Sequence, residues 1–119
     1  MRARARRVAV VEDDPSMRTS VARLLRIHGI DSELYSSAEA FLAGLADSMA
    51  DCVLADIHLG GLSGIELCRC LKASGRFPRV VVMTALDNKA TEKEAINAGC
   101  AAYLAKPFSA ASLMEAINN

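Results

Sequence analysis

The sequence predicts one α/β domain over residues 1–119, with a mostly parallel sheet covered by helices on both faces. Two observations predict this fold class. Five short strand-like segments, most of them unbroken apolar runs, alternate with five longer segments of helical periodicity. Several runs also end directly in acidic, hydroxyl or basic residues, as buried parallel strands do at a sheet edge. Hydrophobic residues make up 52% of the chain, enough for one sizeable core and too many for a disordered protein.

The first predicted strand covers residues 8–11, an apolar and β-branched run that ends in acids. A helix follows, for which Asp14 is the expected N-cap and Pro15 the first residue. As a cap, Asp14 is a weaker candidate for a metal ligand. Apolar residues then recur at the spacing of one helical face until Gly29 ends the helix.

The second predicted strand, residues 30–34, alternates polar with less polar side chains. Such alternation indicates one wet face or a position at the sheet edge. Ser36 and Glu39 have the spacing of a capping box, which predicts the start of the next helix. The third strand covers residues 51–56 and ends in Asp56. The loop beyond it contains the adjacent glycines Gly60 and Gly61, which make it conformationally permissive.

The second half of the chain repeats the alternation of helices and strands. The third helix is expected from Ile65 to about Gly75, and the fourth strand over residues 80–83. Residues 88–98 predict a helix with a thin apolar face, and residues 101–104 a fifth strand. A last helix is expected after Ser109. Alternation of this kind calls for right-handed crossovers between parallel strands.

Polar residues follow four of the strands and are therefore expected to meet at one edge of the sheet. They are Glu12 and Asp13, Asp56, Thr84 and Lys106. Carboxylates crowded together repel, and a divalent cation relieves the repulsion. Oxygen ligands alone favour Mg²⁺ over zinc. A carboxylate is also a nucleophile for phosphoryl groups, for which a lysine and a hydroxyl supply stabilising contacts.

The combination of these residues resembles the receiver domains of two-component response regulators. The resemblance rests on Glu12-Asp13, Asp56, Thr84-Ala85, Tyr103 and Lys106-Pro107, and it covers roughly residues 7 to 118. It implies a flavodoxin-like fold, a doubly wound five-stranded parallel sheet in the order 2-1-3-4-5 with five helices. It also implies a cis bond between Lys106 and Pro107.

The resemblance further implies a chemical role for each residue at the strand ends. Asp56 would be the phosphoacceptor for a sensor histidine kinase, and Lys106 would pair with the phosphoryl group. Mg²⁺ would be held by Asp56 and Asp13, by Glu12 mostly through water, and by the backbone carbonyl of His58. The domain would then catalyse only its own phosphorylation and dephosphorylation, and would not be an enzyme in the ordinary sense.

The same resemblance implies a switch made by Thr84 and Tyr103. The hydroxyl would move toward the phosphoryl group, the ring would move inward, and the surface of the fourth helix, fifth strand and fifth helix would report the change. The partner expected to recognise the changed surface is a downstream effector domain or protein, commonly one that regulates transcription. A phosphorylation-dependent homodimer stays open, and so does an effector domain beyond residue 119, although a longer regulator is the favoured expectation.

Two positions depart from the family pattern. Many receivers have proline where Gly60 stands, so the order of this loop without metal is in question. Leu86 lacks a polar group to orient an attacking water, which indicates slow loss of the phosphoryl group. Two rival functions are an aspartyl-phosphate-type small hydrolase and a degenerate receiver that only binds proteins. The first expects a second acid near the nucleophile, where His58 stands, and the second expects loss of the acceptor or the lysine.

Charge and cysteine usage bound the partners. The expected flexible tail, residues 1–6, is rich in arginine, and acidic residues outnumber basic ones in the rest of the chain. Direct nucleic-acid binding by this domain is therefore not expected. The four cysteines lack metal-site spacing, and no apolar run reaches the length of a membrane span. Reduced core cysteines and a cytoplasmic location are the expectation.

Overall fold

The computed structural model describes residues 5–75 and 79–118. In this part of the chain five parallel strands form one sheet in the order β2-β1-β3-β4-β5, which confirms the predicted fold class and strand order. The strands are β1 (Arg7–Val11), β2 (Asp31–Tyr35), β3 (Cys52–Asp56), β4 (Arg79–Thr84) and β5 (Ala102–Ala105). The helices are α1 (Pro15–Ile27), α2 (Ala38–Ala43), α3 (Gly64–Ser74), α4 (Lys89–Asn97) and α5 (Ala110–Asn118), with a short 3-10 turn, η1 (Leu45–Asp47).

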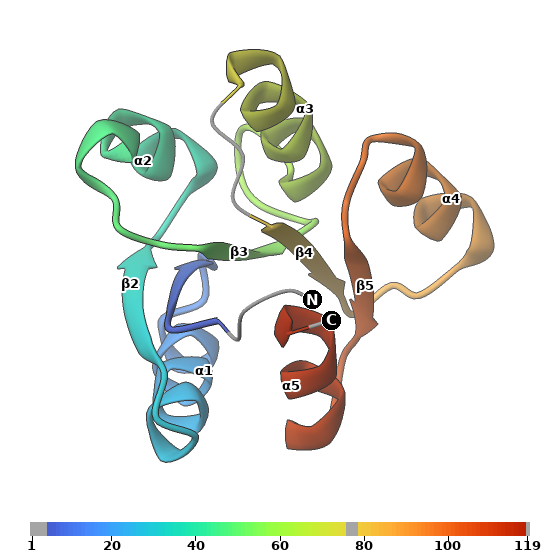
Figure 1. Ribbon diagram of the computed structural model, residues 1–119. Helices are drawn as coiled ribbons and strands as arrows, with labels where there is room; N and C mark the ends of the chain where they lie inside the picture. Colours follow the sequence, from blue (N-terminus) through green and yellow to red (C-terminus); the bar gives the residue numbers. More distant parts are fainter. Residues whose placement is uncertain (1–4, 76–78, 119) are drawn as a thin grey trace.

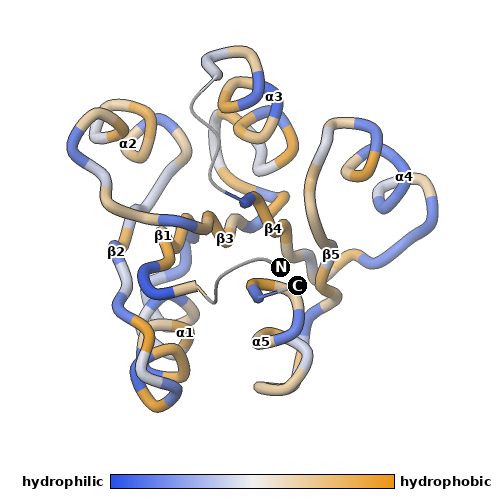
Figure 2. Tube along the Cα trace, in the orientation of Figure 1, coloured by the Kyte–Doolittle hydropathy of each residue, from blue (hydrophilic) through white to orange (hydrophobic). Residues whose placement is uncertain are grey.

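The sheet separates two layers of helices. Helices α1 and α5 cover one face, and α2, α3 and α4 cover the other (Figure 1). Successive residues of each central strand point to opposite faces, so Val8 and Val10 join the core under α1 and α5, whereas Ala9 joins the core under α2 to α4. Strands β1, β3 and β4 are apolar along most of their length, and β2 is paler (Figure 2). Burial on both faces explains the unbroken apolar runs.

Strand β2 lies at the edge of the sheet, which confirms one of the two positions that the alternation indicated. Leu34 is 47% exposed, whereas the side chain of Glu33 is only 11% exposed. The Glu33 carboxylate accepts hydrogen bonds from Arg7, Tyr35 and Ser48, and from the backbone of Met49. A carboxylate with this many donors is stable in a half-buried position, so polarity alone did not identify the wet side.

The predicted cap of α1 is confirmed, and the predicted cap of α2 is wrong. Asp14 caps α1, and its side chain accepts from the Ser16 N–H at 3.0 Å, as expected. The predicted capping box at Ser36 and Glu39 is wrong. Ser37 caps α2 instead, one residue later, and accepts from the Ala40 N–H. A complete capping box stands at the start of α3, where Ser63 and Glu66 bond to each other's backbone.

The inner end of the expected tail is part of the fold. The Ala5 N–H donates to Asn118 Oδ1 at 2.8 Å, and the Arg6 N–H donates to Asp51 Oδ2 at 3.0 Å. Ala5 is also buried. Ala5 and Arg6, the last two residues of the predicted flexible segment 1–6, are therefore bonded to the folded body, and residues 1–4 lie outside the described residues.

The four cysteines lie in unequal surroundings. Cys52 and Cys68 are buried core residues, Cys100 is half-buried, and Cys70 is exposed on the outer side of α3. The prediction of core cysteines is therefore confirmed for Cys52 and Cys68 and is wrong for Cys70. Within the described ranges no helix is long and apolar enough to cross a membrane.

Candidate functional site

Three carboxylates meet where β1 and β3 end. Glu12 and Asp13 directly follow β1, and Asp56 is the last residue of β3. One oxygen from each lies within 4.8 Å of the others, a spacing that could hold a metal ion. Glu12 is 1% exposed and Asp56 is also buried, whereas Asp13 is exposed. Parallel pairing of β1 with β3 produces this meeting, because it brings both carboxyl ends to one edge.

Lys106 joins two of these carboxylates. Its ammonium nitrogen donates to Glu12 Oε1 at 2.8 Å and to Asp56 Oδ2 at 2.7 Å. The lysine follows β5 and its side chain is only 17% exposed. The peptide bond between Lys106 and Pro107 is cis, as expected. Residues far apart in the chain thus form one ion-pair network at the strand ends.

The electrostatics of the network follow from burial and from these bonds. Burial raises the pKa of Glu12, hydrogen bonds from Lys106 and from the Asp14 N–H oppose the rise, and the net shift is upward. For Lys106, burial acts to lower the pKa, but hydrogen bonds to Asp56 and Glu12 outweigh it and raise the pKa overall. The lysine therefore stays a cation, and Glu12 takes up a proton more readily than an ordinary glutamate.

Each oxygen of Asp56 has its own partner. Oδ2 faces Lys106, and Oδ1 accepts from the backbone N–H of His58 at 2.8 Å. The next turn of chain is close-packed, since a methyl group placed on Gly64 would lie 2.5 Å from the Asp56 carbonyl oxygen. The acidic side chain is thus fixed by a bond at each oxygen. The imidazole of His58 is exposed, and the backbone of that residue faces the site.

The two residues expected to form a switch lie near the network but bond elsewhere. Thr84 ends β4 and is buried, and its Oγ1 accepts from the Leu86 N–H at 2.9 Å. The Tyr103 hydroxyl donates to Asp87 Oδ1 at 3.0 Å near the surface. Both bonds hold the segment between β4 and α4. The structure therefore brings Glu12, Asp13, Asp56 and Lys106 together directly, and connects Thr84 and Tyr103 through the next loop.

Sequence reasoning missed three polar residues that hold this region. Arg18 on α1 donates to the Glu12 carbonyl at 2.8 Å. Asp87 is the partner of Tyr103, and Glu39 accepts from the Leu62 N–H at 2.9 Å. Nothing in the sequence pairs any of them with its partner. The spacing of Glu39 from Ser36 indicated a helix cap and gave no sign of its contact with Leu62.

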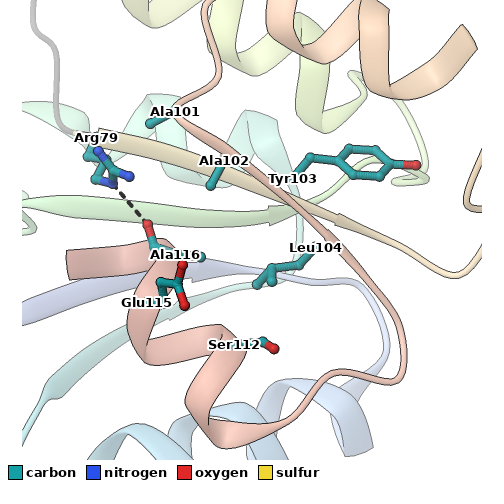
Figure 3. Close-up of a pocket in the computed structure, with 8 residues that line it drawn as sticks. All are labelled: Arg79, Ala101, Ala102, Tyr103, Leu104, Ser112, Glu115 and Ala116. Carbon is teal, nitrogen blue, oxygen red and sulfur yellow. Dashed lines mark hydrogen bonds between the residues drawn. The ribbon is translucent and has the colours of Figure 1, made fainter. Parts of the chain in front are cut away.

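A hollow of about 370 Å³ lies elsewhere, between β5 and α5 (Figure 3). Arg79 crosses one side and donates to the Ala116 carbonyl at 2.9 Å, and the Tyr103 ring is directed away from the other labelled residues. None of the clustered carboxylates lines it, nor does Lys106. The hollow is therefore separate from the candidate site.

Comparison with known sequences gives one consistent result. Residues 8–118 match the family model for the response regulator receiver domain. The transcriptional regulatory protein FixJ of Azorhizobium caulinodans is 36% identical over 110 residues, which are 92% of this chain and 52% of FixJ. The response regulator MprA of a Mycobacterium species is 33% identical over 108 residues, 91% of this chain and 47% of MprA. The chain thus spans about half the length of the curated relatives it matches.

Solved structures agree with the sequence comparison. A crystal structure titled FixJ-N superimposes with a TM-score of 0.87 and 31% identity, covering 94% of this chain and 90% of that one. The receiver domain of the Francisella response regulator 1452 gives a TM-score of 0.87 at 25% identity, covering 94% and 93%. The likeness extends over nearly the whole of both chains.

Proposed function

The chain belongs to the response regulator receiver domain family, and from that membership we propose that it is a phosphorylation switch with Asp56 as its phosphoacceptor. Receiver domains are signalling domains. The observation that carries the proposal is the Lys106 bridge between Asp56 and Glu12, with Asp13 beside it. Three carboxylates and an ammonium lie in one place, which supports Asp56 as the nucleophile and Lys106 as the cation for the phosphoryl oxygens.

The proposed reaction is transfer of a phosphoryl group from a phosphohistidine of a sensor kinase. An Asp56 carboxylate oxygen forms the new bond to phosphorus, the bond from phosphorus to the histidine nitrogen breaks, and an acyl phosphate results. The Lys106 ammonium, released from its pair with Asp56, moves to a phosphoryl oxygen. The His58 N–H continues to hold the carboxyl group in place.

Mg²⁺ is the proposed cofactor, and the residues present fit it. All the donors are oxygens, on Glu12, Asp13 and Asp56, and no cysteine or imidazole is part of the group. We assign a further ligand to the carbonyl of His58. When bound, Mg²⁺ supplies positive charge against the phosphoryl oxygens, which is the main need of this class of reaction.

The proposed switch consists of breaking the two bonds that hold the loop after β4. The Thr84 hydroxyl exchanges the Leu86 N–H for a phosphoryl oxygen, and the Tyr103 hydroxyl leaves Asp87. The surface made by α4, β5 and α5 changes as a result. The partner that recognises the changed surface is a downstream effector domain or protein, or a second copy of the chain. The pathway is cytoplasmic and regulates transcription. FixJ, a transcriptional regulatory protein by name, supports this last step.

Incubation with Mg²⁺ and acetyl phosphate tests the proposal by intact-protein mass spectrometry. The expected result is the mass gain of one phosphoryl group, abolished in Asp56→Asn and retained in Asp47→Asn, a matched change in η1. The gain should also vanish when Mg²⁺ is chelated. Steady consumption of acetyl phosphate with many turnovers would instead identify a hydrolase. A wild-type protein that neither gains mass nor turns over the donor would be a binding module only.

A further inference from the structure

The loop between β3 and α3 needs an external support, and α2 provides it. The loop runs through Gly60 and Gly61, and Gly61 has a φ of 87°, in the left-handed region that favours glycine. Two adjacent glycines leave the backbone many alternative conformations. The ends of the loop are held by the His58 N–H on Asp56 and by the capping box of α3. In its middle, Leu59 and Leu62 pack against the core, and one side chain from another element bonds to the backbone.

That side chain is Glu39, in the first turn of α2. Its Oε2 accepts from the Leu62 N–H at 2.9 Å, across 23 positions of the sequence. The carboxylate also lies over Gly61, because a methyl group placed on that glycine would overlap it. Ser37 already caps α2, so the carboxylate of Glu39 is not needed for the cap. Hydrogen bonds from the Leu62 N–H and from its own N–H hold the pKa of Glu39 below its usual value.

We propose that Glu39 is a positioning residue, which fixes the loop over residues 57–62 so that the His58 carbonyl is presented to the metal. This inference rests on the proposed function, since it concerns the loop that carries a proposed Mg²⁺ ligand. The bond to Leu62 takes the place of the stiffness that a rigid residue at position 60 would give. This Glu39–Leu62 hydrogen bond, the tether, reduces the conformational entropy that the loop loses when the metal binds.

The consequence is separable from the chemistry of phosphoryl transfer. Glu39 contacts none of the reacting groups, so it acts on how readily the loop closes on the metal and not on the reaction once the metal is held. Its loss should weaken Mg²⁺ binding and leave the rate at saturating Mg²⁺ unchanged. A residue that merely supported the fold would change both together or neither.

The test compares Glu39→Ala and Glu39→Gln with Glu94→Ala, an exposed glutamate on α4 that serves as the matched control. Calorimetry of the unphosphorylated protein measures Mg²⁺ affinity, and NMR measures amide exchange of Leu62. Glu39→Ala should weaken Mg²⁺ binding roughly three- to tenfold, the net worth of one hydrogen bond, and speed the exchange of Leu62. Glu39→Gln, which keeps an acceptor oxygen, should show a smaller loss. Glu94→Ala should behave as wild type in both measurements.

A second variant removes dependence on a single substitution. Gly61→Ala should displace the carboxylate from Leu62, so its effect on Mg²⁺ affinity should be smaller in the Glu39→Ala background than alone. An unchanged Mg²⁺ affinity or an unchanged Leu62 exchange rate in Glu39→Ala overturns the inference. Failure of wild type to accept a phosphoryl group overturns the proposed function instead, because affinity and exchange still report on the tether.

Discussion

At the scale of single residues, Lys106 decides the charge balance of the site. It is the cation bonded to both Glu12 and Asp56, and all three side chains have little contact with water. The carboxylates of Glu12 and Asp56 have oxygens within 4.8 Å of each other, and they repel strongly because little water screens them. The lysine offsets that repulsion in the unphosphorylated protein, and in the proposed reaction it turns to the phosphoryl group.

Replacing Lys106 by methionine keeps most of the side-chain volume and removes the charge. We expect the free energy of unfolding at pH 7 and low Mg²⁺ to fall by roughly 1–3 kcal/mol, since two carboxylates lose their partner near the protein surface. Urea denaturation measures the loss. Added Mg²⁺ should recover part of it, and should stabilise Lys106→Met more than wild type. Equal stabilisation of the two proteins would contradict the role given to the lysine.

Leu86 is the second residue with a measurable consequence. It is exposed, and its N–H bonds to Thr84 while its side chain offers no polar group. Leu86→Glu should shorten the half-life of the acyl phosphate roughly threefold or more, because a carboxylate there can orient an attacking water. Decay after removal of acetyl phosphate measures the half-life. Leu86→Ala, which adds no polar group, should match wild type, and a wild-type half-life no longer than that of Leu86→Glu would refute the expectation.

At the scale of elements, the edge strand β2 is anchored by one carboxylate. Burial acts to raise the pKa of Glu33, but hydrogen bonds from Ser48, the Met49 N–H, Arg7 and Tyr35 outweigh it and lower the pKa to about 2. The carboxylate thereby joins β2 to β1 and to the segment that enters β3. The anchor depends on the charge, so it depends on pH.

Glu33→Gln should therefore destabilise the protein by roughly 1–3 kcal/mol at pH 7. The folded pKa lies below the ordinary value of 4.5, so the contribution is full above pH 4.5 and is lost as the pH falls toward 2. Urea denaturation of both proteins at pH 7 and at pH 3 measures the difference, which should be smaller at pH 3. A difference that is the same at both pH values would exclude this account.

Helix α4 should be the least stable helix of its length. Only Ala95 is buried along it, and Ile96 is 61% exposed. Few buried contacts imply a low free energy of local opening. Amide exchange in α4 should be faster than in α5, which also has nine residues but buries Leu113, Ala116 and Ile117. Exchange in α4 as slow as in β1 and β3 would contradict this expectation.

The elements that the sequence located well are those whose burial alone determines them. The apolar runs of β1, β3 and β4 have neighbours on both faces, so composition was enough. Ser36 and Ser37 illustrate the opposite case, since both can cap a helix by residue type and only Ser37 does so. The half-buried position of Glu33 was not predicted from the sequence, because the donors around its carboxylate come from other elements.

At the scale of the whole molecule, the strand order decides which residues meet. Glu12, Asp13, Asp56 and Lys106 were found from the sequence because each follows a strand, and parallel strands end together. Asp87 and Glu39 were not found, because their partners Tyr103 and Leu62 are selected by loop conformation. A side chain that supports a loop leaves no periodic signal in the sequence.

Metal binding should stabilise the whole fold. Mg²⁺ at ten times its dissociation constant should raise the free energy of unfolding by about 1.4 kcal/mol, which corresponds to roughly 4–6 °C in the thermal midpoint. Thermal unfolding followed by circular dichroism measures the shift. Asp13→Asn should reduce it, whereas Asp14→Asn should not, because asparagine also caps a helix and Asp14 is not a proposed ligand. Equal shifts in the two variants would exclude Asp13 as a ligand.

The hydrogen bond between the Ala5 N–H and Asn118 Oδ1 holds the two ends of the described chain together. It brings the segment that leads into β1 beside the last turn of α5, at the edge of the sheet opposite the carboxylates. A circularly permuted chain, joined here and opened at an exposed turn, would keep every strand neighbour.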